Sequence, residues 1–336
     1  MNARRTPLSL LICLLCCCCF LLPPSPAYAQ NAASAASAPA KAHKKAHKRK
    51  AHKRALSPVR RRAYSADDDS RFAAIVVNAD TGHILYQVNA DEPRHPASLT
   101  KMMTLYLLFE ALKKGRISQE TLLPVSANAA GQAPTNMRLT AGDRIPVRIA
   151  IECLIVRSAN DIAMAVAEAL GGSEEGFAQM MNRKSRQLGM NDTQFFNPNG
   201  LPDDRQITTA ADMARIGIAL RRDFPEYYGY FALREFSFRG NRYPGHNRLL
   251  GRYPGADGIK TGFIGASGYN LVTSVHRGGT HLVGVILGGR SASSRDQQMM
   301  VMLDRVFEKL ASHEHQAAAA AVPPPTPQAP PAAQVN

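Results

Sequence analysis

Three short strings in the sequence carry side chains that could together attack and hold a carbonyl compound. In chain order they are Ser98-Leu99-Thr100-Lys101, Ser158-Ala159-Asn160 and Lys260-Thr261-Gly262. On a helix, positions i and i+3 face the same way, so the Lys101 amine can reach the Ser98 hydroxyl. A neutral lysine can activate such a serine, and burial or a second cation such as Lys260 favours the neutral form. The strings therefore predict nucleophilic catalysis by a serine.

Each string also has a simpler interpretation. Ser98 could be only a helix N-cap, with Lys101 as a solvated residue of the first turn. The serine-x-asparagine pattern occurs a second time, at Ser126-Ala127-Asn128. Ser126 precedes the loop-like stretch 129–136, whereas Ser158 lies between two segments with helical patterns. We therefore assign Ser158, and not Ser126, to the predicted site.

The elements that must position these residues follow from the hydrophobic pattern. Strand patterns cover residues 72–78, 83–88, 258–261, 269–275 and 281–287. Helical patterns cover residues 98–112, 147–156, 161–170, 176–188, 208–220 and 295–310. Strands at both ends with helices between them predict an α+β fold, in which the terminal strands form one antiparallel sheet beside a helical subdomain. We expect this domain to span residues 71–312.

Residues 1–29 have the three parts of a signal peptide. Arg4 and Arg5 precede an apolar run at 8–22, and Ala27-Tyr28-Ala29 matches a small-x-small cleavage site. We expect cleavage and export to the periplasm or cell envelope; an uncleaved N-terminal anchor is the alternative. Five of the six cysteines lie in this segment, which leaves Cys153 alone in the mature chain. Its apolar surroundings predict a buried, inert thiol.

The formal net charge of +15 is concentrated in residues 30–70, which hold no acid before Asp67. This Ala/Lys/His arm has little to bury and is predicted to be disordered, as is the Ala/Pro-rich tail at 313–336. The arm could contact anionic envelope polymers or a membrane surface, or serve only as a spacer. Its lack of aromatic residues before Tyr64 argues against nucleic acid as a partner. Its histidines are embedded in cations and lack a closed ligand set, so no zinc site is expected.

The three strings, in this order, resemble the signature of penicillin-binding proteins and class A β-lactamases. Longer matches point to the low-molecular-mass D-alanyl-D-alanine carboxypeptidases, and they cover residues 71–310. The matching segments are 96–104 (PASLTKMMT), 197–201 (NPNGL), 209–214 (TAADMA), 246–250 (HNRLL), 257–263 (DGIKTGF) and 267–272 (SGYNLV). The resemblance implies a DD-peptidase/β-lactamase-like fold and a peptidoglycan stem peptide as substrate.

The resemblance also implies roles for single residues. Ser98 would attack the carbonyl carbon of the penultimate D-alanine and form an acyl-enzyme, while Lys101 would take its proton. Ser158 would pass a proton to the leaving amine, and Asn160 would hold the substrate amide. No metal ion or organic cofactor is implied.

The remaining implied residues bind the substrate. Lys260, Thr261 and Gly262 would recognise the terminal carboxylate and the extended peptide. The backbone N–H groups of Phe263 and of the nucleophile would form the oxyanion hole. Arg295 lies where the family has an arginine near that carboxylate, although it could equally be an ordinary arginine in the first turn of a helix.

Two departures from related patterns shape the prediction. A class A β-lactamase would have a deacylating glutamate in an E-x-x-L-N string, and Glu168, Glu174 and Glu175 all lack that context. Penicillins should therefore be covalent inhibitors rather than good substrates. The absence of a second β-rich domain leaves a cross-link endopeptidase of the same family as an alternative. From another class, the alternative is a non-catalytic wall-binding protein that uses the basic arm.

Overall fold

The computed structural model describes residues 70–320, and the side chains of residues 70–313. The predicted signal peptide and all but the last residue of the predicted arm lie outside this range. Of the predicted tail, residues up to Ala320 continue the last helix, α8 (Ala292–Ala320), beyond the expected end at Leu310. The alanines at 317–320 explain this extension, because alanine has the highest helix propensity. No helix within the described range is both long and apolar enough to cross a bilayer.

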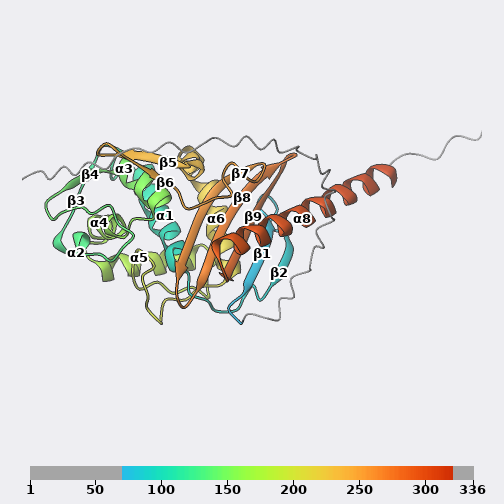
Figure 1. The fold of residues 1–336 in the computed structure, drawn as a ribbon, viewed down its shortest axis with the longest axis horizontal. Coiled ribbons are helices and arrows are strands. Elements are labelled where there is room, and N and C mark those ends of the chain that lie inside the picture. The colour runs from blue at the N-terminus through green and yellow to red at the C-terminus, as the bar shows by residue number, and fades with distance from the viewer. Residues whose placement is uncertain (1–69, 321–336) are drawn as a thin grey trace, which may run out of the picture. The chain divides into compact units, whose positions relative to one another are not determined.

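A five-stranded antiparallel sheet organises the domain (Figure 1). It contains β1 (Ala73–Asn78), β2 (Ile84–Val88), β7 (Ala256–Ile264), β8 (Gly268–Arg277) and β9 (Thr280–Gly289), in the order β2-β1-β9-β8-β7. The first strand of the domain pairs with the last, from Ala73 opposite Leu287 to Asn78 opposite Leu282. This topology confirms the predicted α+β fold with strands from both ends in one sheet.

Both faces of the sheet are buried, and side chains alternate between them along each strand. From β1, Ile75 and Val77 join the large core beneath the helices, whereas Ala74 and Val76 join a smaller core. The smaller core lies under α8, which crosses the sheet in Figure 1 and contributes Leu303. The strands are therefore sandwiched between α8 and the helical part of the chain.

The helical part surrounds one central helix, α1 (Lys101–Lys113), in which eleven of the thirteen residues are buried. The other long helices are α4 (Asn160–Gly171), α5 (Glu174–Gln187) and α6 (Ala210–Asp223). Their bounds differ from the predicted ones by a few residues at most. Because α1 is enclosed by this part and by the sheet, its first turn is held in a fixed place.

The sequence patterns did not predict the short elements. These are α2 (Ala127–Ala130), α7 (Pro225–Tyr228), η4 (Gly229–Ala232), the β3–β4 hairpin (Leu122–Pro124, Arg144–Pro146) and the β5–β6 hairpin (Glu235–Phe238, Asn241–Pro244). Two predicted helices also differ in kind at one end. The helix expected from Ser98 begins as a 3₁₀ turn, η2 (Ala97–Thr100). The helix expected at 147–156 is α3 (Val147–Glu152) followed by a π-helical turn, η3 (Cys153–Arg157). Both changes occur beside residues of the predicted site.

Candidate active site

Ser98 and Lys101 lie on the same side of the turn that leads into α1. Ser98 is in η2 and Lys101 is the first residue of α1. A 3₁₀ turn has three residues per turn, so it stacks positions i and i+3 directly above each other. Lys101 Nζ lies 3.3 Å from Ser98 Oγ. The predicted pairing of nucleophile and base is therefore present in the geometry.

Lys101 is fully buried and is held by two further acceptors. Its amine donates to Asn160 Oδ1 at 2.7 Å and to the carbonyl oxygen of Asn199 at 2.5 Å. Desolvation and the nearby Lys260 lower the pKa of Lys101 well below its ordinary value, and Asp161 only partly opposes this. Burial penalises the charged form, so the amine is set to accept a proton from Ser98.

Ser158 occupies an unusual backbone position at the end of η3. Its φ of 61° is left-handed, which is uncommon for a residue with a side chain. The π-helical turn and this left-handed residue break the helix before α4 begins at Asn160. Ser158 Oγ thereby lies 3.0 Å from Lys260 Nζ. Backbone strain of this kind is concentrated at functional sites.

Lys260 approaches the same point from the sheet. It is buried in the middle of β7, and its ammonium also donates to the carbonyl oxygen of Thr261 at 3.0 Å. Burial and the charge of Arg295 lower the pKa of Lys260 to about 7. At neutral pH this side chain can both carry a positive charge and exchange a proton. It can therefore assist a proton transfer through Ser158.

Two glycines allow other segments to approach the nucleophile closely. A Cβ atom at Gly262 of β7 would lie 3.0 Å from the carbonyl oxygen of Pro96 and 3.1 Å from the amide nitrogen of Ser98. A Cβ atom at Gly200 would lie 1.9 Å from the carbonyl oxygen of Ala97, and the φ of Gly200 is 82°. At Gly200 the contact and the positive φ exclude a larger residue, whereas at Gly262 a methyl group would require its neighbours to move by a few tenths of an ångström. The Gly262 contact places the edge of β7 next to the Ser98 turn.

These segments enclose a cavity of about 450 Å³. Most of the predicted site residues line it, and none of its lining residues is acidic. The lining residues are Ser98, Pro134, Thr135, Ser158, Asn160, Gly200, Leu201, Gly245, His246, Arg248, Thr261, Gly262, Phe263, Ile264, Tyr269, Ala292 and Arg295. Of the remaining predicted residues, Lys101 and Lys260 lie directly behind this wall, bonded to Ser98 and Ser158. The structure thus brings all nine predicted residues to one place.

Ser126, the alternative serine, has a different environment. Its hydroxyl caps α2 by accepting a hydrogen bond from Ala129 N at 2.9 Å, and it donates to Glu168 Oε1 at 2.9 Å. Neither Ser126 nor Glu168 lines the cavity. The assignment of Ser158 over Ser126 is therefore consistent with the geometry, and Glu168 is engaged away from Ser98.

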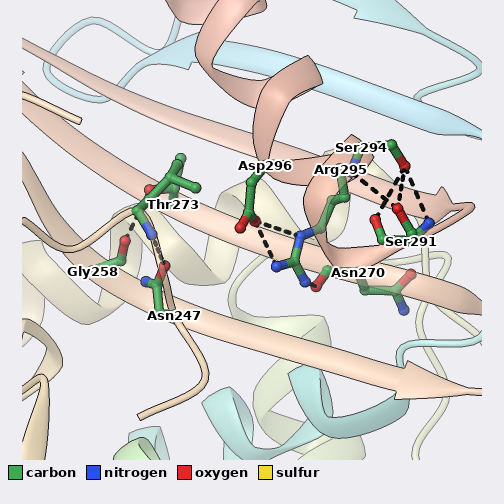
Figure 2. Close-up of polar contacts among 9 residues, drawn as sticks. Asn247, Gly258, Asn270, Thr273, Ser291, Ser294, Arg295 and Asp296 are labelled. Atoms are coloured by element: carbon green, nitrogen blue, oxygen red, sulfur yellow. Dashed lines mark hydrogen bonds and ion pairs between the residues drawn. The ribbon is translucent and has the colours of Figure 1, made fainter. Parts of the chain in front are cut away.

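Arg295 reaches the cavity wall, but its guanidinium is largely occupied (Figure 2). Its Nε and Nη2 donate to Asp296 Oδ1 at 3.0 and 2.6 Å. Its Nη1 donates to the carbonyl oxygen of Asn270 at 2.9 Å. Both partners of the ion pair are buried, so Asp296 offsets the charge that Arg295 could offer a ligand.

Sequence reasoning assigned no role to two asparagines that hold the site together. Asn270 of β8 donates through Nδ2 to the carbonyl oxygens of His95 and Pro96 at 3.0 and 3.1 Å, and its Oδ1 accepts from Gly288 N at 3.0 Å. Asn199 supplies its carbonyl oxygen to Lys101. The available signal for Asn270 was a polar residue within an apolar strand, because a buried amide requires partners.

The described residues contain no group of three or more His, Cys, Asp and Glu side chains that could hold a metal ion. Cys153, at the start of η3, is buried as predicted, and burial raises the pKa of its thiol. The lining of the cavity offers hydroxyl, amide, imidazole and guanidinium groups, with the buried amines of Lys101 and Lys260 bonded to its two serines.

A serine hydroxyl beside a buried amine, and a second serine beside a second buried amine, define an active-serine site at the edge of an antiparallel sheet. The family model for D-alanyl-D-alanine carboxypeptidases matches residues 61–291, and the chain belongs to this family. It is 34% identical to the D-alanyl-D-alanine carboxypeptidase DacF of Bacillus subtilis, over 72% of this chain and 63% of the relative. It is 36% identical to DacA of Escherichia coli, over 68% of this chain and 59% of the relative. The chain thus spans about three fifths of these curated relatives.

Solved structures show the same fold. Penicillin-binding protein 5 from Haemophilus influenzae matches with a TM-score of 0.66 and 32% identity, over 70% of this chain and 69% of that one. Penicillin-binding protein D2 from Listeria monocytogenes, in its cefotaxime-bound form, matches with a TM-score of 0.64 and 28% identity, over 70% of this chain and 96% of that one. The predicted DD-peptidase-like fold is confirmed.

Proposed function

We propose that the protein is a serine-type D-alanyl-D-alanine carboxypeptidase that removes the terminal D-alanine from peptidoglycan stem peptides. The observation that carries the proposal is the buried Lys101 amine 3.3 Å from the Ser98 hydroxyl, at the wall of a cavity without acidic residues. Membership of the carboxypeptidase family supports the choice of substrate. This chain covers about three fifths of DacF and DacA, so the proposal rests on the residues that this chain itself contains.

In the first half of the reaction, Ser98 Oγ attacks the carbonyl carbon of the penultimate D-alanine and Lys101 takes its proton. The backbone N–H groups of Ser98 and Phe263 stabilise the oxyanion, and Asn160 holds the substrate amide. Ser158 passes its proton to the leaving amine and takes one from Lys260, and the proton that Lys101 took from Ser98 restores Lys260. The peptide bond breaks, D-alanine leaves, and the peptidyl group is an ester on Ser98.

In the second half, Lys101 takes a proton from water as the water oxygen attacks this ester, and it returns that proton to Ser98 Oγ as the ester bond breaks and the shortened peptide leaves as an acid. The substrate's terminal carboxylate lies against Lys260 and Thr261. Arg295 adds a positive charge near this carboxylate, reduced by its ion pair with Asp296. No step requires a metal ion or organic cofactor. Penicillins mimic the acyl donor, and one structural neighbour is described in its ampicillin-bound form. The amine released when the β-lactam ring opens stays attached to the acyl group, so it does not leave the cavity as D-alanine does, and no carboxylate of the lining offers a further base; the penicilloyl ester therefore persists.

The same site would also serve an endopeptidase that cuts D-alanyl cross-links. Residues 1–29 support export to the periplasm or cell envelope, where either substrate occurs. The basic arm at 30–70 would then face anionic envelope polymers or the membrane surface. A protein that acts only through this arm would keep its binding when Ser98 is replaced, whereas the proposed enzyme would lose its activity.

The test is intact mass spectrometry of the mature protein and of Ser98→Ala after incubation with benzylpenicillin. The expected result is one penicilloyl adduct on the wild type and none on the variant. Release of D-alanine from a pentapeptide, compared with cleavage of a cross-linked dimer, then separates the two peptidase activities. An intact antibiotic with no adduct on the wild type would overturn the proposal, and rapid hydrolysis of the antibiotic would indicate a β-lactamase instead.

A further inference from the structure

The surroundings of the Lys101 amine decide in which direction its lone pair points. The charged amine has three N–H groups, so the loss of one proton leaves two N–H groups and one lone pair. Two acceptors lie within reach of these N–H groups, Asn160 Oδ1 at 2.7 Å and the carbonyl oxygen of Asn199 at 2.5 Å. When both N–H groups are used in this way, the lone pair is left for the hydroxyl of Ser98, whose Oγ lies 3.3 Å away. The two acceptors therefore determine whether the base faces the nucleophile.

Both acceptors are held from behind by two adjacent residues, Gln132 and Ala133. Asn160 Nδ2 donates to the carbonyl oxygen of Ala133 at 2.8 Å. Asn199 Nδ2 donates to Gln132 Oε1, also at 2.8 Å. Because Gln132 and Ala133 are neighbours in the chain, these bonds form a closed ring. It runs from Lys101 through Asn160, the two neighbours and Asn199 back to Lys101.

Gln132 closes this ring between two separate walls of the cavity. Segment 132–136 contributes to one wall and segment 197–201 to the other. Within the described part of the chain, the bond between Gln132 and Asn199 is the only hydrogen bond that joins these two segments. It therefore sets the position of the Asn199 residue relative to the opposite wall.

The side chain of Gln132 is itself oriented by uncharged partners on its far side. Its Nε2 donates to the carbonyl oxygen of Asn128 in α2 at 3.3 Å. Its backbone carbonyl accepts a hydrogen bond from Asn136 Nδ2 at 2.9 Å. With Nε2 directed toward α2, the other end of the amide, Oε1, faces Asn199. The amide thus presents a fixed acceptor to the ring.

We infer that Gln132 is a positioning residue for the base of the proposed reaction: through Asn199 it turns the lone pair of Lys101 toward Ser98. The inference rests on the proposed function and adds to it a residue outside the three sequence strings. Gln132 does not line the cavity, so its effect on the reaction must pass through Asn199 and Ala133.

The test measures acylation by benzylpenicillin as a function of antibiotic concentration and of pH. The proteins are the wild type, Gln132→Leu, Gln132→Glu and the control Gln119→Leu. Leucine is similar in size to glutamine and has no acceptor. The control removes an acceptor of the same kind, because Gln119 Oε1 accepts a hydrogen bond from the Tyr230 hydroxyl at 3.1 Å, and neither residue lines the cavity.

The maximal rate constant of acylation should fall about tenfold to 100-fold in Gln132→Leu, as for a displaced catalytic group, with the half-saturating concentration unchanged. The acid limb of the pH profile should move to lower pH, because the charged form of Lys101 loses an acceptor and its pKa falls. Gln132→Glu should recover part of the rate, since it keeps an oxygen for Asn199, and its negative charge should move the limb to higher pH. The charged groups that face Lys101, Lys260 and Asp161, are the same in every variant.

An unchanged rate constant or an unchanged acid limb in Gln132→Leu would overturn the inference, and so would an equal effect of Gln119→Leu. A residue that only supports the fold would lower the amount of active protein without moving the limb. The rate constants come from the time course of adduct formation, so they do not depend on the folded fraction, which thermal unfolding measures separately. Absence of an adduct on the wild type would instead overturn the proposed function.

Discussion

Lys260 Nζ lies 3.0 Å from Ser158 Oγ, although 102 residues separate the two in the sequence. The contact joins β7 of the sheet to the residue that follows the π-helical turn η3. It therefore connects the two parts of the domain at the wall of the cavity. The position of the second serine depends on both the sheet and the helical part being in place.

Replacing Ser158 by alanine should slow acylation by benzylpenicillin by about 100-fold, the lower range for loss of a proton-transfer group. Ser98 and Lys101 keep their contact in this variant, so some acylation remains. The control is Ser126→Ala, which removes the cap of α2 and should lower the free energy of unfolding by about 1 kcal/mol without slowing acylation. Rates of adduct formation measure the acylation of both variants, and urea unfolding measures the stability of Ser126→Ala. A Ser158→Ala protein that acylates at the wild-type rate would remove Ser158 from the mechanism.

Stability should rise with pH between about 7 and 10. In the unfolded chain Lys260 has its ordinary pKa of 10.5, whereas in the folded protein this pKa is about 7. Between these values the unfolded chain binds one more proton than the folded protein, so the free energy of unfolding increases with pH. Lys260→Met should remove a slope of at most about 1.4 kcal/mol per pH unit. Urea unfolding at pH 7, 8 and 9 measures the slopes, and identical slopes in both proteins would contradict the prediction.

Gly262→Ala should slow acylation strongly and change the thermal stability of the protein only slightly. The added methyl group would meet Pro96 O at 3.0 Å and Ser98 N at 3.1 Å, so β7 or the nucleophile turn must shift by a few tenths of an ångström. A misplaced nucleophile typically costs about 100-fold in rate. Gly265→Ala is the matched control, because a Cβ atom there has no atom within 4 Å. Gly262→Ala should acylate much more slowly than Gly265→Ala, while thermal unfolding should show that both variants are folded. Equal acylation rates would show that the nucleophile turn tolerates the displacement.

Asn270→Ala should destabilise the protein by about 2–4 kcal/mol. It leaves the carbonyl oxygens of His95 and Pro96 and the Gly288 N–H group without their side-chain partner. Asn241→Ala is the control, because its side chain is exposed and makes one 3.3 Å bond. Urea unfolding should show a change within about 0.5 kcal/mol for this control. If Asn270→Ala were as stable as the wild type, the amide would not be an anchor of the segment before Ser98.

Much of the fold was predictable because its pattern is local. The short apolar runs of β1 and β9, both rich in β-branched residues, mark strands within two or three residues of their observed bounds. The caps of α5 and α6, at Ser173 and Thr209, are ordinary side-chain signals. The three-residue strands of the β3–β4 hairpin were not predictable, because so short a run has no resolvable period.

The sequence was enough to identify the residues of the site, but not to predict how their backbones and side chains are arranged. Ser98, Lys101 and Lys260 follow from their spacing and from family resemblance, whereas the left-handed backbone of Ser158 follows from a π-helical turn that no local signal marks. The ion pair between Arg295 and Asp296 joins adjacent residues, yet only burial against β8 turns the two side chains toward each other. Sequence therefore identified Arg295 as a cation, and only the structure showed that its charge is offset.

The pairing of β1 with β9 has a consequence for how the protein is made. The partner of Ala73 is Leu287, so the first strand has no neighbour on that side until nearly the whole domain has left the ribosome. Contacts between residues so far apart in sequence form late and slowly. The sheet therefore cannot close before β9 has been synthesised, and a nascent chain that lacks β9 leaves one edge of β1 without its partner.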